Sequence, residues 1–234
     1  MALLPACPHC STPVATPGGG FDCGVHGPVP PLWRPTEPSY DDFGQHLRTS
    51  RGLPTYLPWP LGPGWRVSDF GAVGEPERPL GTVAACSGTT ELDGPVDVIV
   101  VHEEPGTGLG GRCAGLRVSY PGPEVGEGQA AARVWIGHQA VSLWPVSVVP
   151  EPVDPTDAGV EAEYGAEGVP PGWEAAAQDD RAVLVGEAGG RWLWLVLQPA
   201  SALLLLRDDW HLHDLSQLGP ELVDLTFGGP QPGW

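Results

Sequence analysis

The sequence contains no lysine, so arginine supplies all 11 basic residues against 29 acidic ones, and the formal net charge is −18 over 234 residues. Charged residues of either sign make up only 17% of the chain. Each contact with a phosphate needs a positive group, and a strongly negative protein repels polyanions. The composition therefore argues against broad electrostatic binding to nucleic acid or to an anionic membrane.

Long apolar runs are scarce as well. The most apolar segment, 192–206, is 15 residues long and contains Gln198-Pro199, whereas a membrane-spanning helix needs about 20 residues. We expect this segment to form two buried strands joined by a turn. The residues before Cys7 include neither a basic region nor an apolar stretch of the kind that a secretion signal carries. These observations predict a cytoplasmic protein that does not contact a membrane.

Glycine and proline are abundant instead, with 34 and 29 residues, about twice their usual share. The hydrophobic fraction of 41% and the ten tryptophans argue against disorder throughout, because such a chain can bury a core. Changes of composition along the chain predict four regions. They are a zinc ribbon at 1–33, a Pro-rich connector with a short helix at 34–64, a β-rich domain at 65–227 and a loose tail at 228–234.

Short runs rich in Val, Leu, Ile and Trp, separated by Gly, Pro and Asp turns, predict strands. The runs are 65–73, 81–87, 96–101, 132–136, 141–148, 182–187, 191–198, 202–207 and 221–227. Gly189-Gly190 predicts a hairpin turn between two of them. Since no long helical pattern separates the runs, an antiparallel or mixed sheet is favoured over a doubly wound one. The predicted fold class is α+β, mostly β, with an N-terminal zinc ribbon.

Two short helical segments complete this prediction. Ser39 can cap a helix whose first turn is acidic, and the apolar spacing extends this helix to about Arg51. A single helical turn is expected at 214–218. Residues 151–180 hold nine acidic residues and no basic one, which predicts a mobile, solvated insertion in the sheet domain, or alternatively an acidic docking segment for a basic partner.

The N-terminal region carries the most specific motif, C-x2-C-x12-C-x2-H, formed by Cys7, Cys10, Cys23 and His26. Each x2 spacing lets a tight turn point two ligands at one ion, and the 12-residue excursion returns the second pair. Disulfides are the alternative, but three cysteines cannot all pair among themselves. His9 lies inside the first turn and is a poorer ligand. The motif predicts one structural Zn²⁺ in a closed site that leaves no position open for catalysis.

Residues 1–36 contain a single basic residue, Arg34, which leaves little to neutralise phosphates. We therefore expect the ribbon to hold the sheet domain or a protein partner rather than nucleic acid. Trp33, Trp59 and Trp65 lie in or beside Pro-rich segments and are candidate partner-binding residues. The alternative is that these rings seal the ribbon against the sheet.

A weaker constellation surrounds the glycine-rich loop that follows the run at 96–101. No Gly-Lys-Ser/Thr follows these glycines, so a nucleotide site is not predicted. If Cys113 stood at a helix start, its thiol could act as a nucleophile with His102 as base and Glu103 or Glu104 orienting the imidazole. The ordinary alternative is a glycine-rich turn with a buried cysteine.

A second weak constellation lies near the C-terminal end. His211 and His213 share one face of an extended segment, with carboxylates nearby. Two imidazoles and a carboxylate could hold a metal with an open position, although the set needs a further ligand such as His102 or His138. The alternative is that they are polar residues at the end of a strand.

An ordered set of motifs extends along most of the chain. The motifs include Cys-Pro-x-Cys, Cys-x-x-His-Gly, Leu-Pro-Trp-Pro-Leu, Ala-Cys-Ser-Gly and Gly-Glu-Ala-x-Gly-Arg-Trp-Leu-Trp. This set resembles an uncharacterised family of zinc-ribbon-headed, β-rich proteins from high-GC Gram-positive bacteria. The resemblance implies the layout given above and the zinc ligands Cys7, Cys10, Cys23 and His26, and it implies no reaction.

These observations predict a non-catalytic, zinc-containing protein-binding or scaffold protein with a protein partner and no direct nucleic-acid contact. The alternative is a small hydrolase or thiol enzyme that uses His102, Glu103 and Cys113, or a metal at His211 and His213. Convergence of His102, a carboxylate and Cys113 in one pocket would favour the enzyme. Their separation would favour the binding protein.

Overall fold

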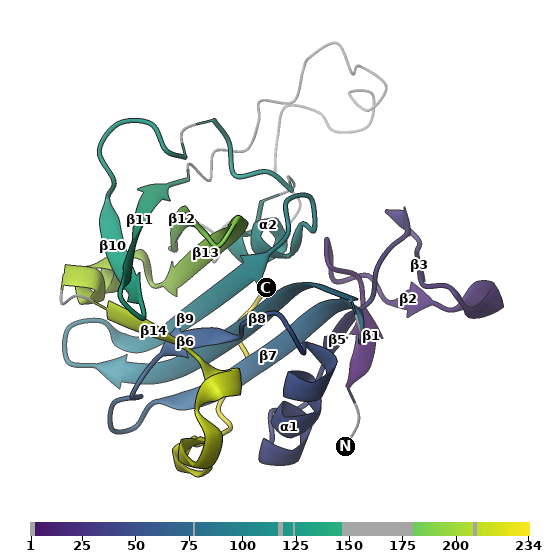
Figure 1. Ribbon diagram of the computed structural model, residues 1–234, viewed down its shortest axis with the longest axis horizontal. Coiled ribbons are helices and arrows are strands. Elements are labelled where there is room, and N and C mark those ends of the chain that lie inside the picture. The colour runs from purple at the N-terminus through teal and green to yellow at the C-terminus, as the bar shows by residue number, and fades with distance from the viewer. Residues whose placement is uncertain (1–2, 77, 117–118, 124, 147–179, 208–209) are drawn as a thin grey trace, which may run out of the picture.

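The computed structural model describes residues 3–76, 78–116, 119–123, 125–146, 180–207 and 210–234. Within them an 11-stranded mixed sheet dominates, and a 3-stranded sheet lies at one end of it (Figure 1). In sheet order the strands of the large sheet are β1 (Leu4–Ala6), β5 (Leu32–Arg34), β7 (Arg66–Glu75), β8 (Arg78–Thr90), β9 (Gly94–Glu103), β13 (Arg191–Gln198), β12 (Ala182–Ala188), β11 (Gln139–Pro145), β10 (Ala132–Ile136), β14 (Trp210–Asp214) and β6 (Tyr56–Pro58). Neighbours are antiparallel except β10 and β14, which are parallel. The predicted α+β, mostly β fold class is confirmed.

The central strands β7, β8, β9, β12 and β13 are buried on both faces of the large sheet, and successive residues of each strand point to opposite sides. On β9, Val100 belongs to one core cluster and Val101 to the other. α1 (Tyr40–Thr49) packs on the first face, and α2 (Leu109–Ala114) packs on the second. Burial on both sides explains why the central strands read as nearly continuous apolar runs in the sequence.

Most of the predicted strands are confirmed. Those at 65–73, 81–87, 96–101, 132–136, 182–187 and 191–198 correspond to β7, β8, β9, β10, β12 and β13, and the one at 141–148 corresponds to β11, which ends at Pro145. The predicted hairpin at Gly189-Gly190 connects β12 and β13, with φ angles of 62° and 82° that favour glycine.

Two strand predictions are wrong. Residues 202–207 lie in a 3-10 helix, η3 (Ala200–Arg207), where Ala202 and Leu206 are buried but Leu204 is 45% exposed. A short, uninterrupted apolar run does not by itself distinguish a strand from a helix. Residues 221–227 begin in η5 (Gly219–Asp224), and strand-like pairing in this segment is limited to an isolated bridge between Val67 and Phe227. The predicted turn at 214–218 is confirmed as η4 (Leu215–Gln217).

The predicted short helix is confirmed as α1. The Ser39 hydroxyl accepts a hydrogen bond from the backbone N–H of Asp42 at 3.2 Å and so caps its first turn. The helix buries Phe43 and His46 against the sheet. Burial lowers the pKa of His46 to about 3, and its Nε2 lies 2.9 Å from the Thr55 hydroxyl. The imidazole is therefore a neutral core group.

The cysteine- and histidine-bearing segment starts from and returns to the large sheet. β1 pairs with β5, and β5 pairs with β7, so both ends of this segment are hydrogen-bonded to the main body. Between them, β2 (Val14–Ala15), β3 (Asp22–Cys23) and β4 (Gly27–Pro28) form the small antiparallel sheet. We refer to residues 7–28 as the ribbon. Figure 1 shows the ribbon projecting beside β1 and β5.

Two further predictions concern segments outside the core. The predicted acidic insertion at 151–180 lies outside the described residues, except for Asp180, whose carboxylate accepts a hydrogen bond from the backbone N–H of Ala200 at 2.9 Å. Residues 228–234, for which the sequence predicts a loose tail, lie against the large sheet, and Pro232 is buried there. No helix in the described part of the chain is long and apolar enough to span a membrane.

Candidate metal centre

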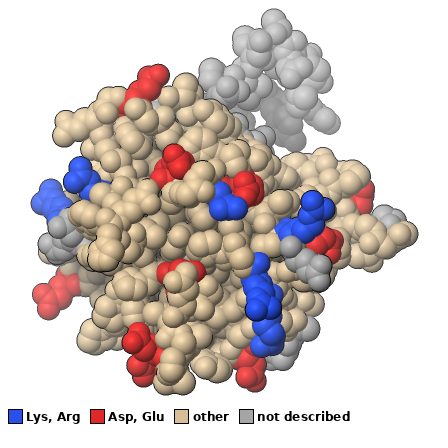
Figure 2. All heavy atoms as spheres, in the orientation of Figure 1, with Lys and Arg blue, Asp and Glu red and all other residues tan. Residues whose placement is uncertain are grey.

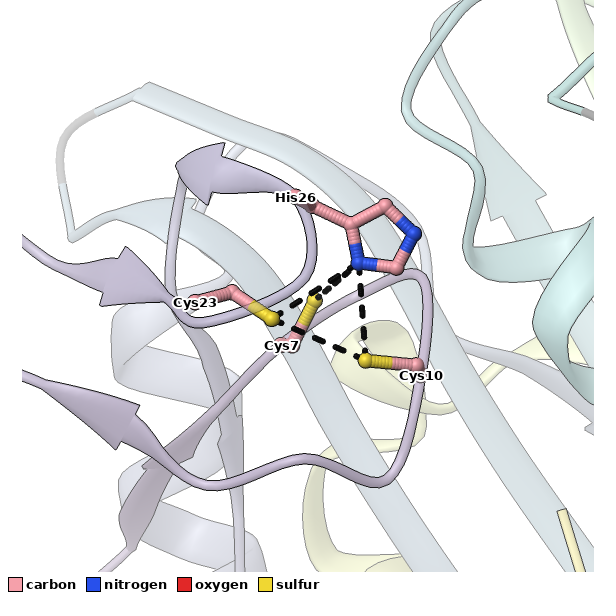
Figure 3. Close-up of side chains that lie close together, drawn as sticks. All are labelled: Cys7, Cys10, Cys23 and His26. Atoms are coloured by element: carbon pink, nitrogen blue, oxygen red, sulfur yellow. Dashed lines mark hydrogen bonds between the residues drawn. The ribbon is translucent and has the colours of Figure 1, made fainter. Parts of the chain in front are cut away.

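Four potential ligand atoms converge at the base of the ribbon and lie within 4.8 Å of one another (Figure 3). They are Sγ of Cys7, Cys10 and Cys23 and Nδ1 of His26. The nitrogen is 3.5 to 3.6 Å from the three sulfurs, and Sγ of Cys10 is 3.7 Å from Sγ of Cys23. Ligand atoms around a tetrahedral ion with Zn–S of about 2.3 Å and Zn–N of about 2.0 Å are about 3.5 to 3.8 Å apart. The four side chains could therefore hold one metal ion.

Two tight turns place these ligands. The first turn follows β1, where the backbone N–H of His9 points at Sγ of Cys7 with a separation of 3.4 Å. The second turn joins β3 to β4, so that Cys23 and His26 flank it. Gly27 follows with a φ of 68°, a conformation that side chains other than glycine adopt at a cost. The spacing of the motif thus presents the ligands in two pairs through local turns, and the pairing of β2 with β3 belongs to the small sheet that brings the two pairs together.

Burial differs across the four ligands. Cys7 and Cys23 are buried, Cys10 is half-buried and His26 is exposed. Burial raises the pKa of Cys7 to about 11, whereas the hydrogen bond from the backbone N–H of Val25 lowers the pKa of Cys23. A thiol must lose its proton to bind a metal. A bound cation would supply the positive charge that keeps the buried Cys7 sulfur deprotonated.

The centre is fastened to α2 and to the loop before it. Nη1 of Arg112 donates a hydrogen bond to the carbonyl oxygen of Cys7. The ring of His9 fits against Gly108, where a Cβ would collide with it. The same ring lies 5.1 Å from the ring of His26, centroid to centroid. These contacts attach the first turn of the ribbon to the second face of the large sheet.

The exposed side of the centre borders a cleft of about 610 Å³. His9, Cys10 and His26 line it from the ribbon, and Gly108 and Leu116 line it from the opposite side. Solvent therefore reaches the centre from one side, at the two less buried ligands.

Sequence reasoning did not single out Arg112 or Gly108 as supports of the centre. Arg112 is 105 residues from Cys7 along the chain, and no local pattern predicts so distant a hydrogen bond. The run of glycines at 106–111 is the one signal that was present, because glycine permits close approach of another side chain.

The proposed thiol triad does not assemble. His102 and Glu103 are consecutive residues of β9 and point to opposite faces of the sheet. Nε2 of His102 lies 3.1 Å from the carbonyl oxygen of Ala188. Cys113 is the fifth residue of α2 rather than its start, it is fully buried, and burial raises the pKa of its thiol far above the usual range. The alternative of a reactive thiolate at a helix start therefore does not hold, and Cys113 is a buried cysteine, as the ordinary interpretation expects.

Glu103 has a structural role instead. Its two carboxylate oxygens accept hydrogen bonds from the backbone N–H groups of Leu109 and Gly110, at 2.9 and 3.1 Å. These are the first two residues of α2, whose N–H groups have no partner within the helix. Burial raises the pKa of Glu103 to about 7, against the lowering effect of the two hydrogen bonds.

The alternative metal pair is exposed on β14. His211 and His213 point to the same side, as the extended conformation requires, and the His211 ring stacks on Trp135 at 6.3 Å. His102, suggested as a third ligand, is buried in the core, and His138 is exposed in the turn between β10 and β11. Among the described residues, Cys7, Cys10, Cys23 and His26 are the one group of three or more potential ligands that lies close enough to hold an ion.

The three candidate partner-binding tryptophans are all half-buried and contact their own chain. Nε1 of Trp33 donates a hydrogen bond to the carbonyl oxygen of Gly74 at 3.0 Å, and its ring packs edge-on against Phe21 of the ribbon at 5.5 Å. Trp59 and Trp65 pack against the first core cluster. Trp33 is thus the ring that joins the ribbon to the sheet.

The fold and the site together define a β-rich protein whose N-terminal Cys3His cluster could hold a metal ion. The sequence matches the model of a family of unknown function (DUF6758) over residues 1–158 and 150–233. These two matches span nearly the whole chain, so the protein belongs to that family. No curated protein and no solved structure matches it.

Proposed function

We propose that Cys7, Cys10, Cys23 and His26 hold one structural Zn²⁺, and that the protein is a non-catalytic binding or scaffold protein. The observation that carries this proposal is the convergence of three sulfurs and one imidazole nitrogen, which all lie within 4.8 Å of one another, with the nitrogen 3.5 to 3.6 Å from each sulfur and two of the sulfurs 3.7 Å apart. Soft thiolates with an imidazole select zinc among the common divalent ions. Four protein ligands fill a tetrahedral shell and leave no position for a substrate.

The positions of the candidate catalytic histidines and of Cys113 support a binding role over thiol catalysis. His102 and Cys113 are both buried, and the sheet separates them because they lie on its opposite faces. The exposed pair of His211 and His213 has no third ligand among the described residues. A general base must lie within hydrogen-bond reach of the group it deprotonates, and His102 and Cys113 do not meet that condition.

A protein partner is supported over nucleic acid by the distribution of charge. On the face shown in Figure 2, basic and acidic side chains form small separate patches, and uncharged residues cover most of the surface. Nucleic-acid binding modules instead carry a continuous basic stripe. The accessible parts of Trp33, Trp59 and Trp65 are the proposed contacts for a partner, because aromatic rings contribute strongly at protein interfaces.

Zinc analysis of the purified protein tests the proposal. The wild-type protein should carry one zinc per chain, and Cys10→Ser should carry markedly less, because three ligands and a hydroxyl hold zinc poorly. Cys86→Ala is the matched control, because Cys86 is fully buried in the core and is not a ligand. It should retain one zinc. A wild-type protein without zinc after expression in zinc-replete medium contradicts the proposal, as does equal zinc in Cys10→Ser.

A further inference from the structure

The segment 231–234 lies on Arg34, Asp69 and Arg112, which we call the cradle. The cradle adjoins the metal centre, because Arg112 also contacts the backbone of Cys7. The ring of Trp234 lies under the guanidinium groups of Arg34 and Arg112, whose Cζ atoms are 4.0 and 4.9 Å from the ring centroid. Trp234 also packs on the apolar cluster of the second sheet face. A guanidinium group within about 6 Å of a tryptophan ring is attracted by the negative face of the ring. Trp234 therefore contacts both cations at once.

A buried carboxylate anchors one side of the cradle. Asp69 is fully buried, and its carboxylate pairs with Arg34 through contacts of 2.5 and 3.1 Å. The side-chain amide of Gln231 donates to the same carboxylate and to the carbonyl oxygen of Pro35, at 3.3 Å each. Breaking a buried pair of this kind is costly. Arg34 thus keeps the ion pair with Asp69 as a partner besides the ring of Trp234.

Arg112 is held differently. No carboxylate pairs with it among the described residues, and its contacts are the carbonyl oxygen of Cys7 and the ring of Trp234. Cys7 is a ligand of the proposed zinc site, so one side chain links that site to Trp234. If the ring is removed, the half-buried guanidinium group loses its other partner, and an alternative conformation that reaches water becomes competitive.

We propose that Trp234 is a positioning residue of the metal centre, acting through Arg112 on the backbone of Cys7. The inference rests on the proposed zinc site and adds to it a second, distant determinant of metal retention. With Trp234 docked, Arg112 holds the first turn of the ribbon against α2. With Trp234 undocked, that turn opens more often and zinc leaves faster. For the two equilibria the relation is reciprocal: bound zinc favours docking of Trp234 by the same factor by which docking raises the affinity for zinc.

The rate of zinc transfer from the loaded full-length protein to a chromogenic chelator tests this. Trp234→Ala should transfer zinc about 5-fold faster or more, the usual lower range for coupling between sites. Trp234→Phe keeps an aromatic face and should fall between Trp234→Ala and the wild-type protein. Trp135→Ala is the matched control, because Trp135 is a half-buried ring that stacks on His211 in β14, outside the cradle. It should leave the rate unchanged.

A double-mutant cycle separates positioning from general destabilisation. Arg112→Met removes the guanidinium group but keeps an unbranched side chain, and it should also speed zinc transfer. In the Arg112→Met background, Trp234→Ala should add little, because the route through Arg112 is already absent. Fully additive effects overturn the inference, and so does an unchanged rate in Trp234→Ala. A wild-type protein that binds no zinc contradicts the proposed function itself, whereas zinc-loaded wild-type protein with a normal rate in Trp234→Ala overturns the inference alone.

Discussion

The two sheets of the molecule are stabilised by different means. The large sheet has an extended apolar cluster on each face, with fully buried residues such as Phe70 on one and Trp194 on the other. The ribbon packs around a small separate cluster, in which the buried residues are Cys7, Cys23 and the adjoining Val29. Two of these three are proposed zinc ligands. So little apolar burial does not by itself offset the conformational entropy of an ordered chain. We therefore expect the ribbon to depend on the proposed zinc ion and the large sheet to fold without it.

The difference also predicts which of the two sheets a mutation destabilises. A small module whose folding energy comes from a metal unfolds when the metal is lost. A sheet stabilised by its own two cores keeps its fold under the same treatment. β1 pairs with β5, and β5 pairs with β7. We therefore expect the part that unfolds on metal loss to end where the ribbon joins these strands.

The largest expected effect is on the ribbon alone. Cys10→Ser, or chelation of the wild-type protein, should remove most of the roughly 10 kcal/mol that a structural zinc site supplies. Amide hydrogen exchange should then lose its protection at 7–28, while β8, β9 and β13 keep theirs. Cys86→Ala should leave exchange in the ribbon unchanged. Loss of protection throughout the large sheet would show that the two sheets do not differ in this way.

The next effect lies in the large sheet. Leu195 is fully buried in β13, so Leu195→Ala leaves a cavity and should lower the free energy of unfolding by about 2 to 5 kcal/mol. Chemical denaturation followed by tryptophan fluorescence measures the change. The zinc content per folded chain should stay at one. A Leu195→Ala protein that loses zinc while it is still folded would contradict the independence of the two cores.

The third effect is a pH dependence in the large sheet. Glu103 has a folded-state pKa of about 7 against an ordinary value of 4.5, so the folded protein holds its proton more tightly than the unfolded chain does. Stability from this group is therefore present at low pH and is lost as the pH rises from about 4.5 to about 7. The loss amounts to at most about 3 kcal/mol.

Glu103→Gln tests this assignment, because glutamine resembles the protonated carboxyl and does not titrate. The amide nitrogen of glutamine cannot accept one of the two backbone N–H bonds, so the variant should have a lower free energy of unfolding than the wild-type protein near pH 4.5. As the pH rises from there, the wild-type protein should lose stability relative to the variant, so that the two curves do not run parallel. Denaturant titrations at several pH values measure the divergence. Parallel curves across that range would contradict the assignment, because they would mean that Glu103 has the same pKa in the folded and the unfolded state.

The smallest expected effect is at the contact between the two sheets. Trp33→Ala removes the hydrogen bond to Gly74 and the edge-on contact with Phe21, which together contribute about 1 to 2 kcal/mol. Hydrogen exchange should speed up in the ribbon by a corresponding factor, with little change in the thermal midpoint. Trp65→Ala is the contrasting variant, because Trp65 packs on the first core cluster and over Gly88. It should lower the thermal midpoint and leave the ribbon unchanged.

Local patterns in the sequence predicted what local geometry determines. The x2 spacings of Cys7, Cys10, Cys23 and His26 produce two tight turns, and their ligand atoms meet as expected. The strands from β7 to β13 followed from their composition and from the turns between them. The capping of α1 by Ser39 followed in the same way, because the cap and the helix are adjacent in the sequence.

Features that depend on distant parts of the chain could not be predicted. The apolar run at 202–207 has the composition of a strand, and its 3-10 conformation depends on how it packs over the sheet. The hydrogen bond from Arg112 to Cys7 and the contacts of Trp234 join segments that no short-range pattern relates. The position of Cys113 inside α2, rather than at its start, depends on where Glu103 caps that helix.

X-ray absorption at the zinc edge tests the central claim most directly, because it reports the atoms bound to the metal in the intact protein. A structural site formed by Cys7, Cys10, Cys23 and His26 predicts three sulfurs at about 2.3 Å and one nitrogen at about 2.0 Å. In Cys10→Ser, any zinc that remains should have lost one sulfur from this shell. A shell of nitrogen and oxygen atoms without sulfur in the wild-type protein would contradict the account.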